Sequence, residues 1–295
     1  MAGQVLTIAC AQTGARSGAG ISDQALQETA DLISAAADQG AQIVIFPELF
    51  LTPFFPNKLN RDVSDYFMTI SDSRLLSLCD ACRSSGISAI IPIAEAVGPA
   101  YYNSAIYVDS KGRVVGTYRK THMPAYFPTD QPGGTGSFER MYFAPGEELP
   151  VFDQKGVPFG IQICNDRLYP EGSRVLALKG AKMLFMPISY SVYDQPQQRR
   201  ENWDAILRAR AIENGVFVIA CNRAGKEGPR HHLGRSMIIA PGGKVLRTAS
   251  ETSDELMICD LNLDELEDAR FSMPWWRDRR SSLYQSLSAS CSSDM

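Results

Sequence analysis

Three side chains with the chemistry of acyl transfer stand where strand-like segments of the sequence end. Glu48, Lys120 and Cys164 each come directly after a short run rich in β-branched and aromatic residues. In open α/β sheets, functional groups gather just beyond the carboxyl ends of the strands. Taken singly, a glutamate or lysine at such a place is more often a solvated surface charge, and a cysteine more often a core residue. Together, however, the three supply every group that one reaction needs.

The reaction that this set predicts is the attack of a cysteine on an acyl carbon. A thiolate is the nucleophile, so Cys164 needs a neighbouring base or positive charge. Glu48 can act as that base if burial raises its pKa. The ammonium group of Lys120, with a backbone N–H near Cys164, can stabilise the thiolate and the developing oxyanion. The sequence therefore predicts covalent catalysis by Cys164, Glu48 and Lys120.

Histidine is the more usual base in thiol hydrolases, and the chain contains three: His122, His231 and His232. His231 and His232 lie in a stretch rich in glycine, proline and arginine, which predicts that both face solvent. His122 follows Lys120 by two residues and could reach the same cleft, where it would bond to the substrate or serve only the structure. A dyad of Cys164 and His122 is the less favoured alternative.

Strand-like and helix-like segments alternate along the chain. Short apolar runs predict strands at residues 5–11, 43–46, 88–95, 159–164, 183–186, 216–220 and 255–260. Paired runs around glycine turns predict hairpins at 103–109 with 113–118 and at 236–240 with 244–249. Apolar residues at helical spacing predict helices at 22–39, 73–84, 171–179, 202–214 and 263–271. This alternation predicts an α/β fold with helices packed on sheets.

No linker or repeat divides the sequence, so residues 1–295 are expected to form one domain. The segment 126–139 is rich in Gly, Pro and Thr and lacks periodicity, which predicts a long loop of the kind that forms lids or binding sites. The last residues are small and polar. We therefore expect residues 286–295 to be disordered or to pack on a partner subunit, and the C-terminal tail at 277–295 to contact such a subunit.

Composition and charge exclude several classes of function. A net charge of −4 with a pI near 5.5 argues against a nucleic-acid partner. No apolar run approaches the roughly 18–20 residues of a membrane span, and the first residues do not resemble a signal peptide. Seven scattered cysteines predict reduced thiols in a cytoplasmic protein, with the CxxC pair Cys79 and Cys82 as ordinary helix residues. No spacing of metal ligands is evident, so neither a metal nor another cofactor is expected.

Three segments together resemble a known family. Residues 46–49 (Phe-Pro-Glu-Leu), 118–122 (Tyr-Arg-Lys-Thr-His) and 163–167 (Ile-Cys-Asn-Asp-Arg) are similar, in order and spacing, to the catalytic signatures of the carbon–nitrogen hydrolase (nitrilase) superfamily. The resemblance spans roughly residues 4–285. It implies an αββα four-layer sandwich and a triad of Glu48, Lys120 and Cys164. It also implies a homodimer or higher homo-oligomer, paired face to face through the helix after the nucleophile and the C-terminal tail.

The resemblance extends to a second glutamate and to one branch of the family. The segment 138–143, followed by Pro-Gly, is similar to the region that carries a second active-site glutamate, which would be Glu139. Residues 51–56, 163–171 and 178–181 look closest to the N-carbamoyl-amino-acid amidohydrolases. This implies a small-molecule substrate whose N-carbamoyl group is hydrolysed to an amine, carbon dioxide and ammonia.

Two departures from that branch concern the substrate. Members that act on N-carbamoyl-D-amino acids usually have two consecutive arginines after the Asn-Asp pair, whereas this chain has Arg167 followed by Leu168. The histidine that they carry shortly before the second glutamate is replaced by Ser137. One arginine can still bind a carboxylate with two hydrogen bonds, and branches whose substrate has an amine tail lack it. Arg167 therefore predicts an acidic or polar substrate; the alternative is a salt bridge to Asp166 or Glu171.

Position alone nominates further residues that could bind the substrate, with ordinary packing as the alternative for each: Phe54, Tyr126, Asn165, Tyr190 and Trp203. The rival enzymes are an aliphatic or omega amidase and a nitrilase, which would use the same triad. A non-catalytic oligomeric scaffold of the same fold would not need all three triad residues. A nucleotide-binding fold would need a glycine-rich turn after the first strand, and residues 11–15 do not supply one.

Overall fold

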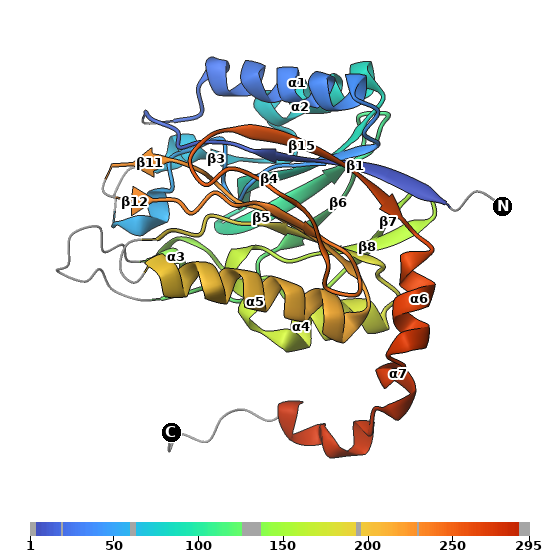
Figure 1. Cartoon of the computed structure of the whole chain (residues 1–295). Coiled ribbons are helices and arrows are strands. Elements are labelled where there is room, and N and C mark those ends of the chain that lie inside the picture. The colour runs from blue at the N-terminus through green and yellow to red at the C-terminus, as the bar shows by residue number, and fades with distance from the viewer. Residues whose placement is uncertain are drawn as a thin grey trace.

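The chain folds into four layers, with two β-sheets stacked face to face between two layers of helices (Figure 1). The computed structural model describes residues 4–18, 20–59, 63–125, 137–192, 196–228 and 230–288. Helices α1 (Asp23–Asp38) and α2 (Ser73–Ser85) cover one sheet, and α4 (Pro170–Leu178) and α5 (Pro196–Asn214) cover the other. The expected αββα sandwich is confirmed.

The first sheet has seven strands in the order β15-β1-β2-β4-β5-β6, with β3 paired to β4. Their bounds are β1 Val5–Gln12, β2 Ile43–Ile45, β3 Phe67–Met68, β4 Ser88–Val97, β5 Ala100–Val108, β6 Val114–Arg119 and β15 Glu255–Asn262. Strands β1, β2 and β4 are parallel. Glu48, in the loop after β2, and Lys120, directly after β6, therefore follow strands of the same sheet.

The second sheet has six strands in the order β14-β13-β10-β9-β8-β7. Their bounds are β7 Val151–Gln154, β8 Val157–Ile161, β9 Met183–Pro187, β10 Phe217–Cys221, β13 Met237–Ile239 and β14 Val245–Thr248. Parallel pairing of β8, β9 and β10 brings the segments that follow these strands to the same edge of the sheet. A separate two-stranded ribbon joins β11 (Lys226–Glu227) to β12 (Arg230–His231).

The core between the sheets is built from the inward faces of both. Ile8 of β1 and Phe159 and Phe185 of the second sheet are fully buried there, and the rings of Phe159 and Phe185 meet edge to face at 5.2 Å. Gly160 allows α4 to pack closely on β8, because a Cβ at this position would lie 2.7 Å from Leu176. Interiors this dense hold the two sheets, and the loops at their ends, in a fixed relation.

Helix boundaries follow local capping chemistry. The Ser22 side chain accepts from the backbone of Ala25 at the start of α1, and Asp72 caps α2 in the same way. Helix α2 ends at Gly86, whose φ of +66° suits glycine. In the described part of the chain, no helix combines the length and the apolar character needed to cross a membrane.

Several expectations need correction. Helix α5 begins at Pro196 and not at 202, since proline is well accommodated in a first helical turn. Strand β8 ends at Ile161, before Cys164. His232 is fully buried and does not face solvent. The β11–β12 ribbon folds back, and the backbone N–H of His232 donates to the carbonyl oxygen of Gly225. Strands β3, β7, β11 and β12 were not predicted; β7 has four residues and the other three have two each.

The C-terminal segment leaves the sandwich after β15. It contains α6 (Glu265–Ser272), α7 (Trp275–Asp278) and two short 3-10 turns, and Figure 1 shows it running along the edge of the sandwich and then beyond α4. Several of its apolar side chains are strongly exposed, among them Phe271 at 89%, Leu283 at 59% and Leu287 at 66%.

Candidate active site

Lys120 lies between two buried carboxylates. Its Nζ donates to Glu48 Oε1 at 2.7 Å and to Glu139 Oε2 at 2.6 Å, and all three side chains are almost fully excluded from solvent. Glu48 comes from the loop after β2, Lys120 from the end of β6, and Glu139 from the first turn of α3 (Glu139–Tyr142). An ammonium group has three N–H donors, so one remains for a reacting oxygen after these two bonds.

Asn103 on β5 completes the arrangement and was not predicted from the sequence. Its Nδ2 donates to Glu48 Oε1 at 2.8 Å and to Glu139 Oε2 at 3.4 Å. The amide and the ammonium group therefore hold the same two carboxylates from different strands. The other oxygen of Glu48, Oε2, is buried and has no hydrogen-bond partner among the described residues, which leaves it able to accept a proton.

Burial and the mutual charges of these groups shift their pKa values. Burial by itself lowers the pKa of Lys120, but the charges of Glu139 and Glu48 outweigh it and place that pKa well above its ordinary value. Burial raises the pKa of Glu139 to about 7; the charge of Lys120 opposes this shift and that of Glu48 adds to it. The lysine is thus held as a cation beside these two carboxyl groups.

Cys164 occupies a strained position at the start of a 3-10 turn, Cys164–Leu168. Its φ of +48° is left-handed, which is unfavourable for a residue with a Cβ and is typical of residues held at functional sites. Burial raises the pKa of its thiol to about 12, the charge of Glu48 adds to the shift, and Lys120 and Arg167 oppose it. The thiol is therefore protonated at rest, and it needs a base when it attacks.

Asp166 ties the turn of Cys164 to the loop of Lys120. Its carboxylate is fully buried and accepts from Tyr118 Oη at 2.6 Å and from the backbone N–H of Ile163 at 2.9 Å. It also accepts from Thr121 Oγ1 at 3.0 Å and from the backbone of His122 at 2.9 Å. One carboxylate thus fixes two segments that follow strands of different sheets, one with the candidate nucleophile Cys164 and one with the cation Lys120.

His122 belongs to this Asp166 network and not to the cavity. Its Nδ1 lies 2.9 Å from Asp166 Oδ1, and its ring stacks on Tyr169 at 3.8 Å. The structure therefore does not bring His122 to the described cavity lining, and the expected contact with substrate gains no support from its position.

Arg223, two residues after the end of β10, holds the loop that carries Glu48. Its buried guanidinium donates to the carbonyl oxygens of Glu48 at 3.1 Å, Thr52 at 2.9 Å and Leu49. Leu49 has a left-handed φ of +50°, so these bonds stabilise a strained turn next to the candidate base. Burial lowers the pKa of Arg223 to about 10, opposed by the charges of Glu227 and Glu48.

Glu227 supports the same loop from the other side. It pairs with Arg223 at 3.2 Å and accepts from the backbone N–H of Phe54 at 2.7 Å. Arg223 was missed in the sequence, although the signal that singled out Glu48 was present: a charged residue shortly after an apolar strand.

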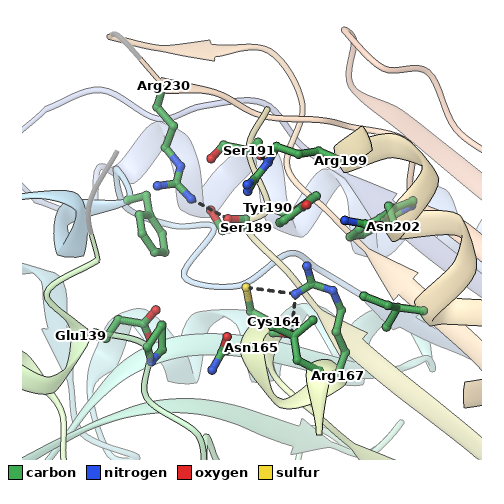
Figure 2. Close-up of a pocket in the computed structure, with 15 residues that line it drawn as sticks. Glu139, Cys164, Asn165, Arg167, Ser189, Tyr190, Ser191, Arg199, Asn202 and Arg230 are labelled. Atoms are coloured by element: carbon green, nitrogen blue, oxygen red, sulfur yellow. Dashed lines mark hydrogen bonds between the residues drawn. The ribbon is translucent and has the colours of Figure 1, made fainter. Parts of the chain in front are cut away.

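A cavity of about 340 Å³ opens beside Cys164 (Figure 2). Predicted site residues that line it are Phe54, Glu139, Cys164, Asn165, Arg167, Tyr190 and Trp203. Further lining residues, which the sequence did not single out, include Ser189, Ser191, Arg199, Asn202 and Arg230. Glu48 and Lys120 are not among the lining residues, and Lys120 contacts the lining through its ion pair with Glu139. Tyr126 lies outside the described residues.

Arg167 reaches into the cavity next to the nucleophile. Its Nη1 donates to the Cys164 carbonyl at 2.7 Å and lies 3.8 Å from Cys164 Sγ. The guanidinium carbon is 4.6 Å from the centre of the Tyr190 ring, and Nε is buried without a hydrogen-bond partner in the described part of the chain. The alternative salt bridge to Asp166 or Glu171 does not form among the described residues.

Fold and site together are those expected of a hydrolase in which a cysteine attacks the carbon atom of a C–N bond. The family description "carbon–nitrogen hydrolase" matches residues 7–271. The chain is 31% identical to the N-carbamoylputrescine amidase of Arabidopsis thaliana over 269 residues, 87% of each chain. It is also 31% identical to the citrullinase of Francisella tularensis over 261 residues, 85% of this chain and 88% of that protein.

A solved structure shows the same fold with an occupied active site. It is a variant of the amidase from Nesterenkonia sp. AN1, 25% identical, with a TM-score of 0.78 over 97% of this chain and 98% of that one. In it, the acetamide moiety of fluoroacetamide is covalently added at the active-site cysteine. The chain belongs to the carbon–nitrogen hydrolase family, and it is an enzyme that acts on non-peptide C–N bonds.

Proposed function

We propose that the chain hydrolyses an N-carbamoyl amino acid to the free amino acid, carbon dioxide and ammonia. Cys164 is the nucleophile, Glu48 the general base, Lys120 the cation that stabilises the oxyanion, and Glu139 the group that orients Lys120. The observation that carries this proposal is the position of Lys120 between two buried carboxylates, one of which, Glu139, lines the same cavity as Cys164.

The first half-reaction transfers the carbamoyl group to the enzyme. Glu48 removes the thiol proton as sulfur attacks the carbonyl carbon, since a thiol with a pKa of about 12 ionises little by itself. The carbonyl oxygen gains the negative charge and accepts from the free N–H of Lys120. The C–N bond to the amino acid then breaks, the leaving nitrogen takes the proton from Glu48, and an S-carbamoyl cysteine remains.

The second half-reaction restores the enzyme. Glu48 takes a proton from water, whose oxygen attacks the thiocarbamate carbon; Lys120 again stabilises the oxyanion. The C–S bond breaks, sulfur recovers a proton from Glu48, and carbamic acid leaves and decomposes to carbon dioxide and ammonia. An amide substrate would follow the same steps but release an acid, with ammonia as the only gas.

Arg167 supports an amino acid as the acceptor part of the substrate. Its buried guanidinium stands within the cavity, 3.8 Å from Cys164 Sγ, with Nε open to a further bond. A carboxylate two or three bonds from the scissile nitrogen would meet it there. The name of one relative, N-carbamoylputrescine amidase, supports the carbamoyl group.

A product assay tests the proposal. Purified enzyme is incubated with N-carbamoyl-D- and L-amino acids, N-carbamoyl-β-alanine, N-carbamoylputrescine, simple amides and nitriles, and both ammonia and carbon dioxide are followed. Both products from an acidic carbamoyl substrate, lost in Cys164→Ala but kept in Cys259→Ala, are expected. Ammonia alone from amides or nitriles would assign the chain to the amidase or nitrilase branches. Substantial carbamoyl hydrolysis by Cys164→Ala would refute the role of this cysteine.

We also propose that the chain forms a homodimer or higher homo-oligomer through the α4 face and the C-terminal segment. Val175 and Leu178 of α4 are 37% and 49% exposed, and Leu283 and Leu287 of the tail are more exposed still. Apolar area of this kind is typical of a subunit contact. Light scattering should give at least twice the mass of the 32.4 kDa chain, and Leu178→Glu should lower it. A wild-type monomer at micromolar concentration would contradict this proposal.

A further inference from the structure

The catalytic cavity is lined by three arginines: Arg167, Arg199 and Arg230. Glu139 is the acidic side chain of the described lining, and it is already bonded to Lys120. Figure 2 shows Arg230 and Arg199 on the side of Ser189 and Ser191, with Arg167 on the opposite side beside Cys164. The charge of this lining favours an anionic ligand over a cationic one. Because arginines lie on two opposite sides of the cavity, one ligand could bind through two separate anionic groups.

Ser189 supplies an independent sign of a ligand. The residue follows β9, is 2% exposed and lines the cavity, yet its Oγ has no hydrogen-bond partner among the described residues. Buried hydroxyls nearly always have a partner, so an unpaired one calls for an explanation. A substrate oxygen that accepts from this hydroxyl would provide it.

Arg230 on β12 is fixed beside Ser189. It is 3% exposed, its Nη2 donates to the carbonyl oxygen of Ser189 at 2.7 Å, and its guanidinium carbon lies 4.2 Å from the centre of the Phe54 ring. The hydrogen bond to this carbonyl oxygen and the contact with the Phe54 ring fix the orientation of the guanidinium group at the cavity wall. Such a preorganised planar group suits a carboxylate.

Arg199 approaches the same side from the first turns of α5. Its Nε donates to the carbonyl of Ser191 at 2.7 Å, and its guanidinium carbon lies 4.4 Å from the centre of the Tyr190 ring. Arg167 lies 4.6 Å from the same centre. The guanidinium carbons of Arg199 and Arg167 can therefore be no farther apart than the sum of these two distances, so one small molecule can reach both sides.

We propose that Ser189, Arg230 and Arg199 form a second anion-binding subsite, and that the substrate is the N-carbamoyl derivative of an acidic amino acid. Its α-carboxylate binds Arg167 next to the scissile bond, and its side-chain carboxylate accepts from Ser189 Oγ and Arg230, with Arg199 adding to the positive charge. The identity of the substrate rests on the proposed carbamoyl hydrolysis; the existence of the subsite does not.

Matched substrates test the second charge. N-carbamoylglutamate is compared with N-carbamoylglutamine, and N-carbamoylaspartate with N-carbamoylasparagine, because each amide has the shape of its acid without the charge. A charge-assisted pair typically contributes enough for roughly a 10–100-fold preference. We expect kcat/KM for the better acid to exceed that of its amide by about this factor. A ratio near one for both pairs would overturn the proposal.

Variants place that preference in the structure. Arg230→Gln should bring the acid-to-amide ratio close to one, because kcat/KM for the acid should fall by much more than kcat/KM for the amide; Ser189→Ala and Arg199→Gln should reduce the ratio in part. Arg230→Lys keeps a positive charge and should retain part of it. The control is Arg200→Gln, the neighbour of Arg199, which pairs with Glu251 at 2.9 Å and is absent from the lining. An unchanged ratio in Arg230→Gln would overturn the subsite.

Calorimetry separates failure of the subsite from failure of the proposed reaction. If the wild-type enzyme hydrolyses no carbamoyl compound, the proposed function fails, and binding of glutarate and of its monoamide to Cys164→Ala still tests the subsite. Tighter binding of glutarate by about tenfold or more, lost in the double variant with Arg230→Gln, would support the subsite alone. Equal affinities would overturn it.

Discussion

Replacing Arg223 by lysine should loosen the loop that carries Glu48 without removing the positive charge. The guanidinium of Arg223 donates to three carbonyl oxygens of residues 48–52 and pairs with Glu227. A guanidinium reaches these acceptors at once because its donors are spread over a rigid plane. The ammonium group of lysine is compact and cannot span the same set.

The expected loss follows from the bonds that lysine cannot replace. If two of the carbonyl bonds are lost, at about 1.5–3 kcal/mol for each bond from a charged donor, the free energy of unfolding should fall by about 3–6 kcal/mol. Leu49, which keeps a left-handed φ of +50°, would also lose the contact that holds it. The base would then sample wrong positions, so kcat should fall by at least about tenfold while KM changes less.

Urea unfolding and steady-state kinetics in the absence of urea check both expectations. Arg200→Lys is the matched control, because Arg200 forms a partly exposed pair with Glu251, and such pairs contribute about 0–1 kcal/mol. An Arg223→Lys enzyme within about 1 kcal/mol of wild type, with an unchanged kcat, would refute the argument that this guanidinium holds Glu48.

Three further changes test other parts of the structure. Burial lowers the pKa of His232 to about 4, so between pH 6.5 and pH 4 the unfolded chain binds more protons than the folded one, and the free energy of unfolding should fall by about 3 kcal/mol as the pH falls. Urea titrations at several pH values should show that His232→Gln loses this pH dependence and that His231→Gln keeps it. An equal pH dependence in both variants and the wild type would contradict the shift. Asn103→Leu should lower kcat by about 10–100-fold, because the amide bonds to both active-site glutamates, and activity within twofold of wild type would exclude a positioning role. Gly160→Ala should lower the free energy of unfolding by about 1–3 kcal/mol, since the new Cβ would press on Leu176. In the control Gly242→Ala the new Cβ meets open space, and thermal unfolding should show no change. Equal melting temperatures for the two variants would show that α4 shifts to make room for the added Cβ.

The strand-end rule singled out the candidate catalytic residues from their local position in the sequence. Glu48 and Lys120 follow strands of the first sheet, and Cys164 follows one of the second, so facing sheets bring their ends together. The same rule could not place Cys164 in a left-handed turn, and the predicted strand ran three residues too far. Hydrophobic pattern marks a run of buried residues; it does not show where the backbone changes direction.

Burial of polar residues was the least predictable feature. His232 stands in a polar stretch that predicts exposure, yet it is fully buried against Glu227. Arg223 donates to Glu48 across 175 residues of sequence, and Asn103 reaches a glutamate 55 residues away. Such contacts depend on packing between distant segments, which no local pattern encodes. The substrate-binding role expected of Tyr126 remains a prediction.

By itself, the sequence determined the α/β class and the residue types of the proposed catalytic set, because alternating strand and helix patterns and the residues that follow them are local properties. The four-layer αββα arrangement came from the family resemblance and not from these patterns. Only the tertiary structure decided that Asp166 connects the segments that carry Lys120 and Cys164, and that Arg223 bonds to the loop that carries Glu48. It also decided that Arg230 bonds to Ser189 across the cavity from Arg167. The physical reason is that hydrogen-bond partners and charge depend on distances fixed by the packing of two sheets.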